Sequence, residues 1–166
     1  LSAILSDTLL FKSPTCTSED EAAAKELAEI AAVDVTSYGL DMLKAGTNLS
    51  DKTAAVLLDL DAKSFPMGGK NVRIAQVNTV DLNEVMARQK ELEEAMADEM
   101  SKNGYDLFVL VVTNILDSDS ELLVAGTGLE KVEEAFQVKL TNNRALLKGV
   151  VSRKKQVVPQ LTAVFS

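Results

Sequence analysis

The spacing of apolar residues between polar ones predicts three capped helices. Residues 18–21 form a capping box, in which Ser and Glu side chains can bond free backbone N–H groups, and apolar residues follow at helical spacing. Residues 81–84 repeat the arrangement with Asp, and the apolar face that follows reaches Gly104, which suits a helix end. A third box at residues 127–130 precedes another apolar face. We expect the longest helix between residue 81 and Gly104.

Shorter helices are predicted where the signals are weaker. Residues 38–44 suit a helix that ends at Gly46, and Ser50 can cap a short helix with apolar positions behind it. A last helix is expected over residues 156–165, because Pro159 is tolerated in a first turn but not deeper.

Strands are predicted between these helices. Residues 107–112 are six apolar residues in a row, the pattern of a strand buried on both faces. Residues 72–80 are rich in β-branched side chains, and residues 122–125 and 145–151 show weaker strand patterns. Because helices and strands alternate, the chain is expected to be an α/β protein with a mixed β-sheet flanked by helices.

The organisation along the chain predicts two parts joined by a short linker. Residues 45–50 lie between the end of one predicted helix and the start of the next, which suits a hinge. Residues 1–44 are too few to hold a core of their own, so they are expected to be the helical end of a truncated domain. Residues 51–166 form the second domain. The chain also starts without Met, inside an apolar stretch, as a fragment would.

Composition then narrows the classes of function. The chain carries 17 Lys and Arg against 25 Asp and Glu residues, a net charge of −8, so its overall field repels nucleic acid. There is no His, which excludes His-based catalysis and His-ligated metal within the chain. The single cysteine, Cys16, cannot form an internal disulfide and suggests a reducing compartment. No apolar run has the ~18 residues that a membrane helix needs.

A run of cations near the end of the chain is the most unusual local feature. Ser152-Arg153-Lys154-Lys155-Gln156 places three cations just before a predicted helix, where backbone N–H groups point outward. Cations there are unfavourable for the helix dipole unless an anion lies between them. Guanidinium forks and ammonium groups both bind phosphate oxygens. The segment therefore suits a phosphate or pyrophosphate site, and a solvated basic loop remains the alternative.

Two further features are open to two interpretations. Lys63 lies in a stretch that ends in the glycine pair Gly68-Gly69, which suits either a turn or a close approach of backbone to a ligand. Asp7 is a carboxylate within the apolar run of residues 1–11, where a charge is costly without a partner. It is either a helix cap or turn residue, or a metal ligand.

Four segments carry a resemblance to a known family. Residues 1–17, Leu-Ser-Ala-Ile-Leu-Ser-Asp-Thr-Leu-Leu-Phe-Lys-Ser-Pro-Thr-Cys-Thr, closely resemble the end of the catalytic domain of manganese-dependent (family II) inorganic pyrophosphatases, in the Asp-His-His phosphoesterase superfamily. The Ser-Arg-Lys-Lys-Gln, Asp-Ala-Lys-Ser-Phe and Lys70–Thr79 segments are similar to that family too. The resemblance covers essentially the whole chain, as the C-terminal portion of such an enzyme.

The resemblance implies roles for four residues. Asp7 would bind one of two catalytic metal ions, and Arg153, Lys154 and Lys63 would bind substrate and take part in catalysis. The activity implied is hydrolysis of pyrophosphate to two phosphates by a two-metal mechanism, with Mn²⁺ or Co²⁺ preferred and Mg²⁺ also used. The family's other Asp and His ligands are absent, so this chain alone is expected to be inactive.

The same resemblance gives the two parts of the chain their expected identities. Residues 1–44 would end the metal-binding catalytic α/β domain, residues 45–50 would be the hinge, and residues 51–166 would be the C-terminal substrate-binding domain. The complete enzyme would be a cytoplasmic homodimer, joined through the missing N-terminal domain, with no nucleic-acid or membrane partner. The alternatives are a related exopolyphosphatase or phosphodiesterase, and an anion-binding module without catalysis.

Overall fold

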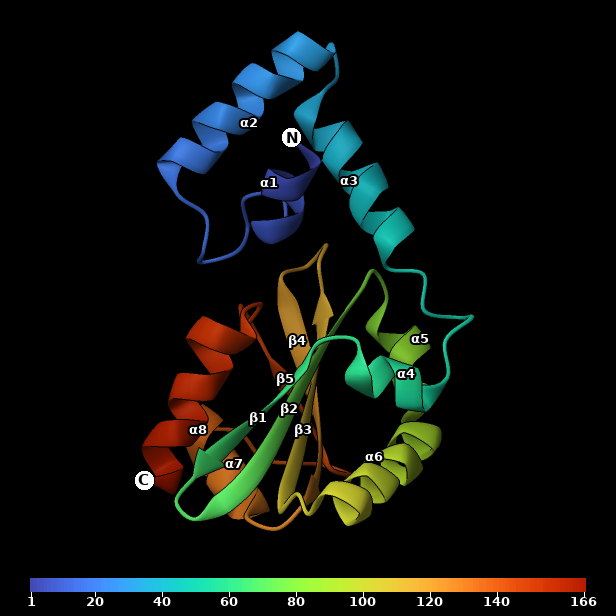
Figure 1. The fold of residues 1–166 in the computed structure, drawn as a ribbon, viewed down its shortest axis with the longest axis vertical. Coiled ribbons are helices and arrows are strands. Elements are labelled where there is room, and N and C mark those ends of the chain that lie inside the picture. The colour runs from blue at the N-terminus through green and yellow to red at the C-terminus, as the bar shows by residue number, and fades with distance from the viewer. The chain divides into compact units, whose positions relative to one another are not determined.

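The computed structural model describes residues 1–166 as two units that separate in a short segment between helices (Figure 1). The first unit comprises Leu1–Asn48 and the second Leu49–Ser166. The division falls inside residues 45–50, the segment that the sequence predicts as a linker. The assignment of these units as a catalytic and a substrate-binding domain stays a prediction.

The first unit contains three helices, α1 (Ser2–Asp7), α2 (Ser18–Ala31) and α3 (Val35–Gly46). The capping box of α2 lies one residue earlier than predicted. Thr17, not Ser18, is the N-cap: its hydroxyl accepts from the N–H of Asp20, whose carboxylate accepts from the N–H of Thr17 at 2.8 Å. The Asp side chain accepts this hydrogen bond as a Glu side chain would, so Thr17 with Asp20 forms the box in place of Ser18 with Glu21.

The second unit is built on a five-stranded sheet. Its strands are β1 (Ala62–Met67), β2 (Lys70–Thr79), β3 (Leu107–Asn114), β4 (Asp119–Gly126) and β5 (Arg144–Leu147). The strand order is β1-β2-β3-β4-β5; only β2 and β3 are parallel, and the other three pairs are antiparallel. Every residue of β3 is buried, as its unbroken apolar run predicts. The expected fold class, α/β with a mixed sheet flanked by helices, is confirmed.

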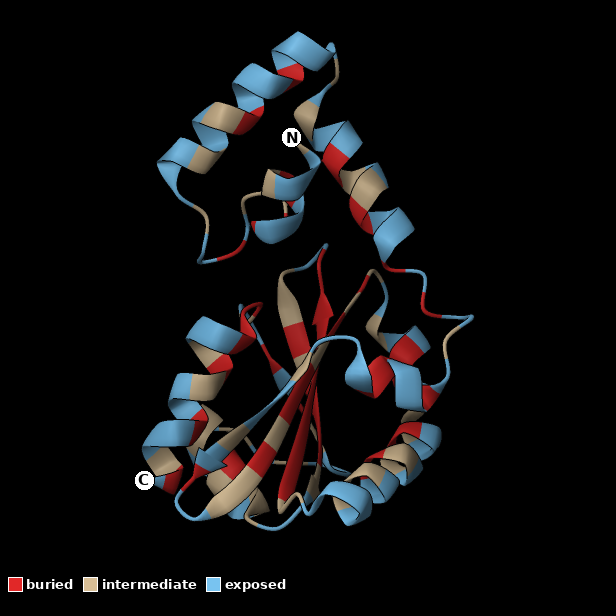
Figure 2. Ribbon diagram, in the orientation of Figure 1, coloured by how far each residue is buried: buried red, intermediate tan, exposed pale blue.

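Helices cover both faces of the sheet, and each face has its own apolar core (Figures 1 and 2). On one face lie α4 (Ala54–Asp59), α5 (Leu82–Met86) and α6 (Gln89–Asn103); on the other lie α7 (Leu129–Phe136) and α8 (Val158–Phe165). Alternate residues of the strands supply the two cores, so Phe108 faces α6 whereas its neighbour Val109 faces α8. None of the helices is both long and apolar enough to cross a bilayer.

Strand β1 lies where the sequence suggests a turn-rich stretch. The turn is confined to Gly68 and Gly69, whose φ angles of 54° and 78° favour glycine, and it joins β1 to β2 as a two-residue hairpin. A Cβ on Gly68 would collide with the carbonyl oxygen of Phe165. Pro66 is tolerated because β1 is an edge strand. The glycine pair is therefore a turn that also admits the end of α8.

Other helix starts differ from prediction where a nearby polar residue serves better. Thr53, rather than Ser50, caps α4. Asp81 caps α5 as expected, but a break at Ala87 and Arg88 separates α5 from α6, which ends at Gly104 as predicted. The single long helix is thus two.

The box predicted at residues 127–130 does not form. The N-cap of α7 is Gly128, which has no side chain that could cap the helix. The Thr127 hydroxyl instead donates to the carbonyl oxygen of Asp106 and accepts from the ammonium group of Lys70. Tertiary partners outcompete the local cap here.

Candidate functional site

The basic segment forms a wide helical turn before the last helix. Ser152 is the N-cap, and its hydroxyl accepts from the N–H of Lys155 at 3.3 Å. Residues Arg153–Val157 form the π-helical turn η1, and α8 continues from it with Pro159 in its first turn. Lys154 is exposed. The helical segment therefore begins at Arg153, three residues before the predicted start at residue 156. Turns of π-helix are frequent at functional sites.

The side chain of Gln156 holds the loop that precedes η1. Its Oε1 accepts from the N–H groups of Val151 at 3.0 Å and Ser152 at 3.1 Å, and its Nε2 donates to the carbonyl oxygen of Gly149 at 2.9 Å. These backbone groups bond a side chain rather than a neighbouring strand. This explains why β5 ends at Leu147 and not at residue 151 as predicted.

Gln76, on β2, holds the same loop from the sheet. Its Oε1 accepts from the N–H of Arg153 at 3.3 Å, and its Nε2 donates to the hydroxyl of Thr113 at 2.9 Å and to the carbonyl oxygen of Val151 at 3.1 Å. All the hydrogen-bonding atoms of the amide therefore have partners. Gln76 ties the backbone of the basic segment to β2 and β3.

A buried pair of hydroxyl groups extends this support to β4. Thr113 and Ser120 are both completely buried, and their hydroxyl oxygens lie 2.8 Å apart. Ser120 also donates to the carbonyl oxygen of Val150. Polar residues from three adjacent strands thus fix the path of residues 150–153. Sequence reasoning missed them, and their only signal is polar residues inside otherwise apolar strands.

Arg153 links the basic segment to the start of β1. Its Nη1 donates to the carbonyl oxygens of Asp61 at 2.6 Å and Ile74 at 3.4 Å, and its Nη2 lies 2.7 Å from Oδ1 of Asp61. The Arg153 side chain is only 10% exposed, whereas that of Asp61 is 57% exposed. The guanidinium group is therefore inserted beside β1 rather than extended into solvent.

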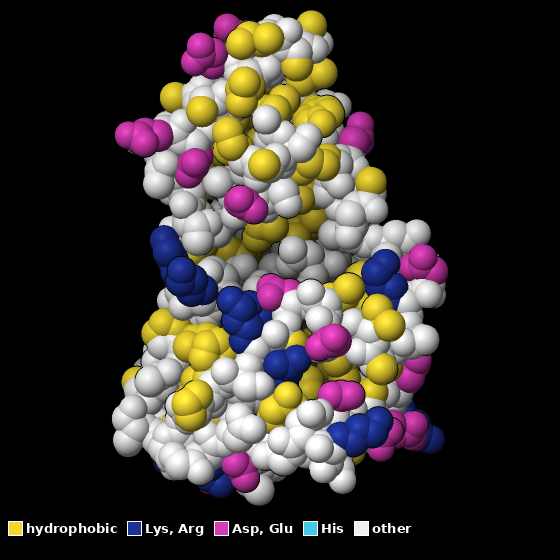
Figure 3. All heavy atoms as spheres, in the orientation of Figure 1, with side chains coloured by type: hydrophobic (Ala, Val, Ile, Leu, Met, Phe, Trp, Pro, Cys, Tyr) yellow, Lys and Arg dark blue, Asp and Glu magenta, His cyan; other side chains and the backbone are white.

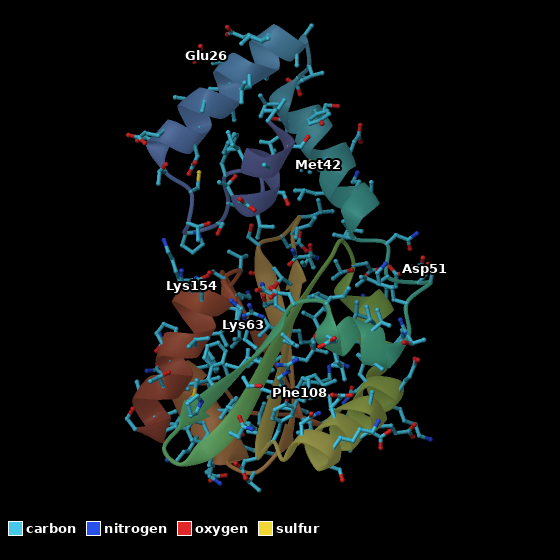
Figure 4. All side chains as sticks on the ribbon, viewed as in Figure 1. Glu26, Met42, Asp51, Lys63, Phe108 and Lys154 are labelled. Atoms are coloured by element: carbon cyan, nitrogen blue, oxygen red, sulfur yellow. The ribbon has the colours of Figure 1, made fainter.

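The contact between Arg153 and Asp61 brings Lys63 to the same part of the second unit as the basic segment. Lys63 is exposed on β1, two residues after Asp61, and its register partner on β2 is Ile74, whose carbonyl oxygen accepts from Arg153. Figure 4 shows Lys63 and Lys154 at the same end of the unit, coming from β1 and from η1. Figure 3 shows Lys and Arg side chains gathered over this end. The three predicted anion-binding residues therefore come from two segments joined by an ion pair.

Asn78 adds a polar group that sequence reasoning missed. It lies on β2 two residues after Gln76, on the same face, and its register partner on β3 is Thr113. Its Oδ1 is buried and has no hydrogen-bond partner. Asn78 is near the carboxyl ends of the two parallel strands, where ligands bind in open α/β sheets. The polar face of this end of the sheet thus includes Asn78.

Asp7, the predicted metal ligand, belongs to the first unit. It is the last residue of α1 and is exposed, and its backbone carbonyl accepts from the hydroxyl of Thr15 at 3.3 Å. The residues that follow, 9–11, have positive φ angles of 48°, 54° and 68°, which is uncommon without glycine. Asp7 is the last helical residue of α1 and not its cap, which is Thr8, and its role as a metal ligand stays a prediction.

The chain does not form a complete metal site. No group of three or more His, Cys, Asp or Glu residues lies close enough together to hold a metal ion. Mn²⁺ requires several oxygen or nitrogen ligands, and Asp7 can supply one carboxylate. The residues present therefore do not fit a bound manganese ion by themselves.

Comparison with protein families shows where this arrangement belongs. The sequence profile of the DHHA2 domain matches residues 40–164. The chain belongs to the DHHA2 domain family. The match includes the hairpin with Lys63, the polar strand residues and η1, and it leaves out Asp7.

Relatives of this DHHA2 chain carry consistent names. A protein of Enterococcus faecalis is 72% identical over all 166 residues, and one of Shouchella clausii is 63% identical over the same length; each is named "probable manganese-dependent inorganic pyrophosphatase". The chain covers 54% and 53% of these relatives, so it spans about half their length. The resemblance drawn from the sequence motifs is confirmed, with this chain matching the C-terminal part of such proteins.

A solved structure supports the same fold for the DHHA2 chain. The crystal structure of a candidate family II inorganic pyrophosphatase from Methanococcus jannaschii is 41% identical and superposes with a TM-score of 0.88. The alignment covers 98% of this chain and 53% of that one.

Proposed function

We propose that the chain is the C-terminal part of a manganese-dependent inorganic pyrophosphatase and supplies the cations that bind pyrophosphate. The observation that carries the proposal is the insertion of Arg153 beside β1, which places η1 next to the segment that holds Lys63. Arg153, Lys154 and Lys63 are the substrate-binding and catalytic residues of this proposal. The names of the relatives supply the substrate.

The chemistry of these three side chains suits pyrophosphate. The substrate carries several negative charges, and breaking its anhydride bond develops further charge on the leaving phosphate. A guanidinium group can donate to two oxygens, and each ammonium group provides a compact positive charge. Fixed cations stabilise developing charge most when water is excluded. The cluster therefore offers a local anion site in a chain whose net charge is −8.

The proposed metal chemistry needs residues outside this chain. Asp7 supplies one carboxylate ligand in the proposal, and the remaining ligands come from the part of the parent protein that this chain does not span. Mn²⁺, Co²⁺ or Mg²⁺ held by Asp7 and those further ligands would lower the pKa of a bound water and polarise phosphate oxygens. In the same proposal, residues 1–44 end the catalytic domain, residues 45–50 form the hinge and residues 51–166 bind substrate.

The proposed setting follows the family resemblance. The complete enzyme is a cytoplasmic homodimer assembled through its N-terminal domain, and its partner molecule is pyrophosphate rather than nucleic acid or membrane. The negative net charge supports the exclusion of nucleic acid.

The test compares lysine variants of the full-length protein in the presence of Mn²⁺. We expect Lys63→Ala and Lys154→Ala each to lower kcat/KM for pyrophosphate by about 100-fold, because each removes a cation from the developing charge. Lys139→Ala is the control, since the Lys139 side chain is 88% exposed and pairs with Glu133 on α7. Loss of activity in the control alone, or none in the two test variants, contradicts the proposed site. Faster hydrolysis of tripolyphosphate than of pyrophosphate by the wild-type protein would instead favour an exopolyphosphatase.

A further inference from the structure

The guanidinium group of Arg153 contacts three oxygen atoms, two from Asp61, the residue before β1, and one from Ile74 on β2. Asp61 supplies both its carbonyl oxygen, 2.6 Å from Nη1, and its carboxylate, 2.7 Å from Nη2. The third oxygen is the carbonyl of Ile74, 3.4 Å from Nη1. The hydrogen bonds and the ion pair of the Arg153 guanidinium use Nη1 and Nη2, which leaves its Nε–H as the donor for a phosphate oxygen.

The three oxygen atoms differ in how firmly they are fixed. The Asp61 carbonyl also accepts from the N–H of Gln76 at 2.8 Å, which continues the β1–β2 pairing, and Ile74 is completely buried in β2. Both carbonyls are therefore rigid parts of the sheet. The Asp61 carboxylate belongs to a side chain that is 57% exposed, and it is held by its contact with Arg153 rather than by the sheet. It is also the only charged partner of Arg153, so it sets the rotation of the guanidinium plane.

We propose that Asp61 is a positioning residue for the reaction: its carboxylate orients the Arg153 guanidinium so that the free Nε–H faces the pyrophosphate site. This inference rests on the proposed function. Asp61 binds no substrate itself. A carboxylate close to an anion site repels the substrate, so its presence there costs affinity. Orientation of the arginine offsets that cost, since a pre-oriented guanidinium loses little freedom when the charge on the phosphate develops.

Asp61→Asn in the full-length protein separates orientation from charge. The amide keeps an oxygen acceptor, so the fold is preserved, but the charged contact that fixes the guanidinium is lost. We expect kcat for pyrophosphate to fall about tenfold, as with other residues that orient a site from behind. KM should not rise, because a negative charge that repels pyrophosphate has been removed. A merely structural defect would instead lower activity together with thermal stability, and would leave no such split between kcat and KM.

Asp59→Asn is the matched control. Asp59 is also exposed and pairs with an arginine, Arg73, at 3.1 Å, only two residues from Asp61. Its loss should leave kcat unchanged. Asp61→Glu, which retains the charge, should recover part of the lost rate. In an Arg153→Lys background, Asp61→Asn should have no further effect, because the two residues act as one unit.

Failure of the positioning role and failure of the proposed function would give different results. An unchanged kcat in Asp61→Asn, or additive losses in the double variant, overturns the positioning role while leaving the proposed function intact. No hydrolysis by the wild-type protein overturns the proposed function. The ion pair is then tested without substrate, through the side-chain Nε–Hε resonance of Arg153 in NMR spectra. That resonance should broaden or shift in Asp61→Asn, and an unchanged resonance refutes the orienting contact.

Discussion

Gln76, which is half-buried on β2, shows how much one side-chain amide can support. It bonds the N–H of Arg153, the carbonyl of Val151 and the hydroxyl of Thr113. We predict that Gln76→Leu lowers the free energy of unfolding by about 2 kcal/mol, because it leaves buried polar groups without partners. Denaturant unfolding measures the change. Gln160→Leu, at an exposed position of α8, should change it by less than about 0.5 kcal/mol. Equal decreases in the free energy of unfolding of the two variants would show that the hydrogen bonds of Gln76 contribute no more to stability than an exposed glutamine does.

Cys16 provides a second test at the residue scale. Desolvation raises the pKa of its thiol, and the nearby Glu21 and Asp20 raise it further. Since the thiolate is the reactive form, Cys16 should be alkylated by iodoacetamide more slowly at pH 7 than a free thiol such as glutathione. Glu21→Gln should accelerate the reaction, and a rate independent of that substitution would contradict the electrostatic cause.

The candidate site was only partly predictable from sequence, because its residues differ in the kind of signal they leave. Arg153 and Lys154 stand out as neighbouring cations in an acidic chain. Asp61 and Gln76 do not, since their partners lie 92 and 77 residues away along the chain. No local pattern of polar and apolar residues encodes such a pairing. Lys63 drew notice only through the glycine pair that follows it, a signal open to two interpretations, and its expected substrate role came from the family resemblance.

At the scale of elements, Arg88 explains why one predicted helix became two. Its Nη1 donates to the carbonyl oxygen of Leu49 at 3.3 Å and its Nη2 to that of Lys52 at 2.7 Å, while its Nε donates to Glu91 at 3.0 Å. These contacts lie at the break between α5 and α6. The residue thereby fastens the first residues of the second unit to the helices behind the sheet.

Replacing Arg88 should loosen that attachment. We predict that Arg88→Ala makes the amides of residues 49–53 exchange with deuterium at least about tenfold faster, because two carbonyl anchors are lost. Lys90→Ala, at an exposed position of α6, is the control and should leave exchange unchanged. Unaltered exchange in Arg88→Ala would show that the segment is held by other contacts.

The same contact should be sensitive to acid. The hydrogen bond from Arg88 holds the pKa of Glu91 below its ordinary value of 4.5. A carboxyl group with a lowered pKa stabilises the fold above its unfolded-state value, and that contribution is lost as the pH falls through the folded-state value. The difference in unfolding free energy between the wild type and Glu91→Gln should therefore be largest near neutral pH, begin to shrink as the pH falls through 4.5, and vanish once the pH lies below the lowered folded-state pKa of Glu91. A difference that persists there contradicts the pairing.

Strand β3 could be predicted from the sequence, whereas strand β1 could not. β3 is buried on both faces, so its apolar run identifies it. β1 is an edge strand that contains Lys63 and Pro66, and half of its residues are exposed, so no alternation of apolar residues distinguishes it from a loop. It is recognisable only after the hairpin and its pairing with β2 are seen.

At the scale of the whole molecule, the chain carries cations but no complete metal site. We predict that the isolated 166-residue chain releases no phosphate from pyrophosphate with Mn²⁺, because Asp7 is its only candidate ligand and no cluster of three ligands exists. Colorimetric phosphate detection, with the full-length protein as the positive control, gives the measurement. Sustained turnover by the isolated chain would mean that its metal ligands have been misassigned.

The α/β class and the mixed sheet followed from regular periodicity and capping residues. The pairing order of the strands did not, because it depends on contacts between residues far apart in the chain.

The collision that a side chain at Gly68 would make with the carbonyl of Phe165 has a mechanical consequence. At one end of β1, Gly68 packs closely against the carbonyl of Phe165 in α8, and at the other end Asp61 pairs with Arg153 of η1. Neither segment can shift along the other without disturbing one of these two contacts. A single-residue insertion or deletion within either would therefore shift one lysine relative to the other, so natural length variation should be confined to loops outside this pair.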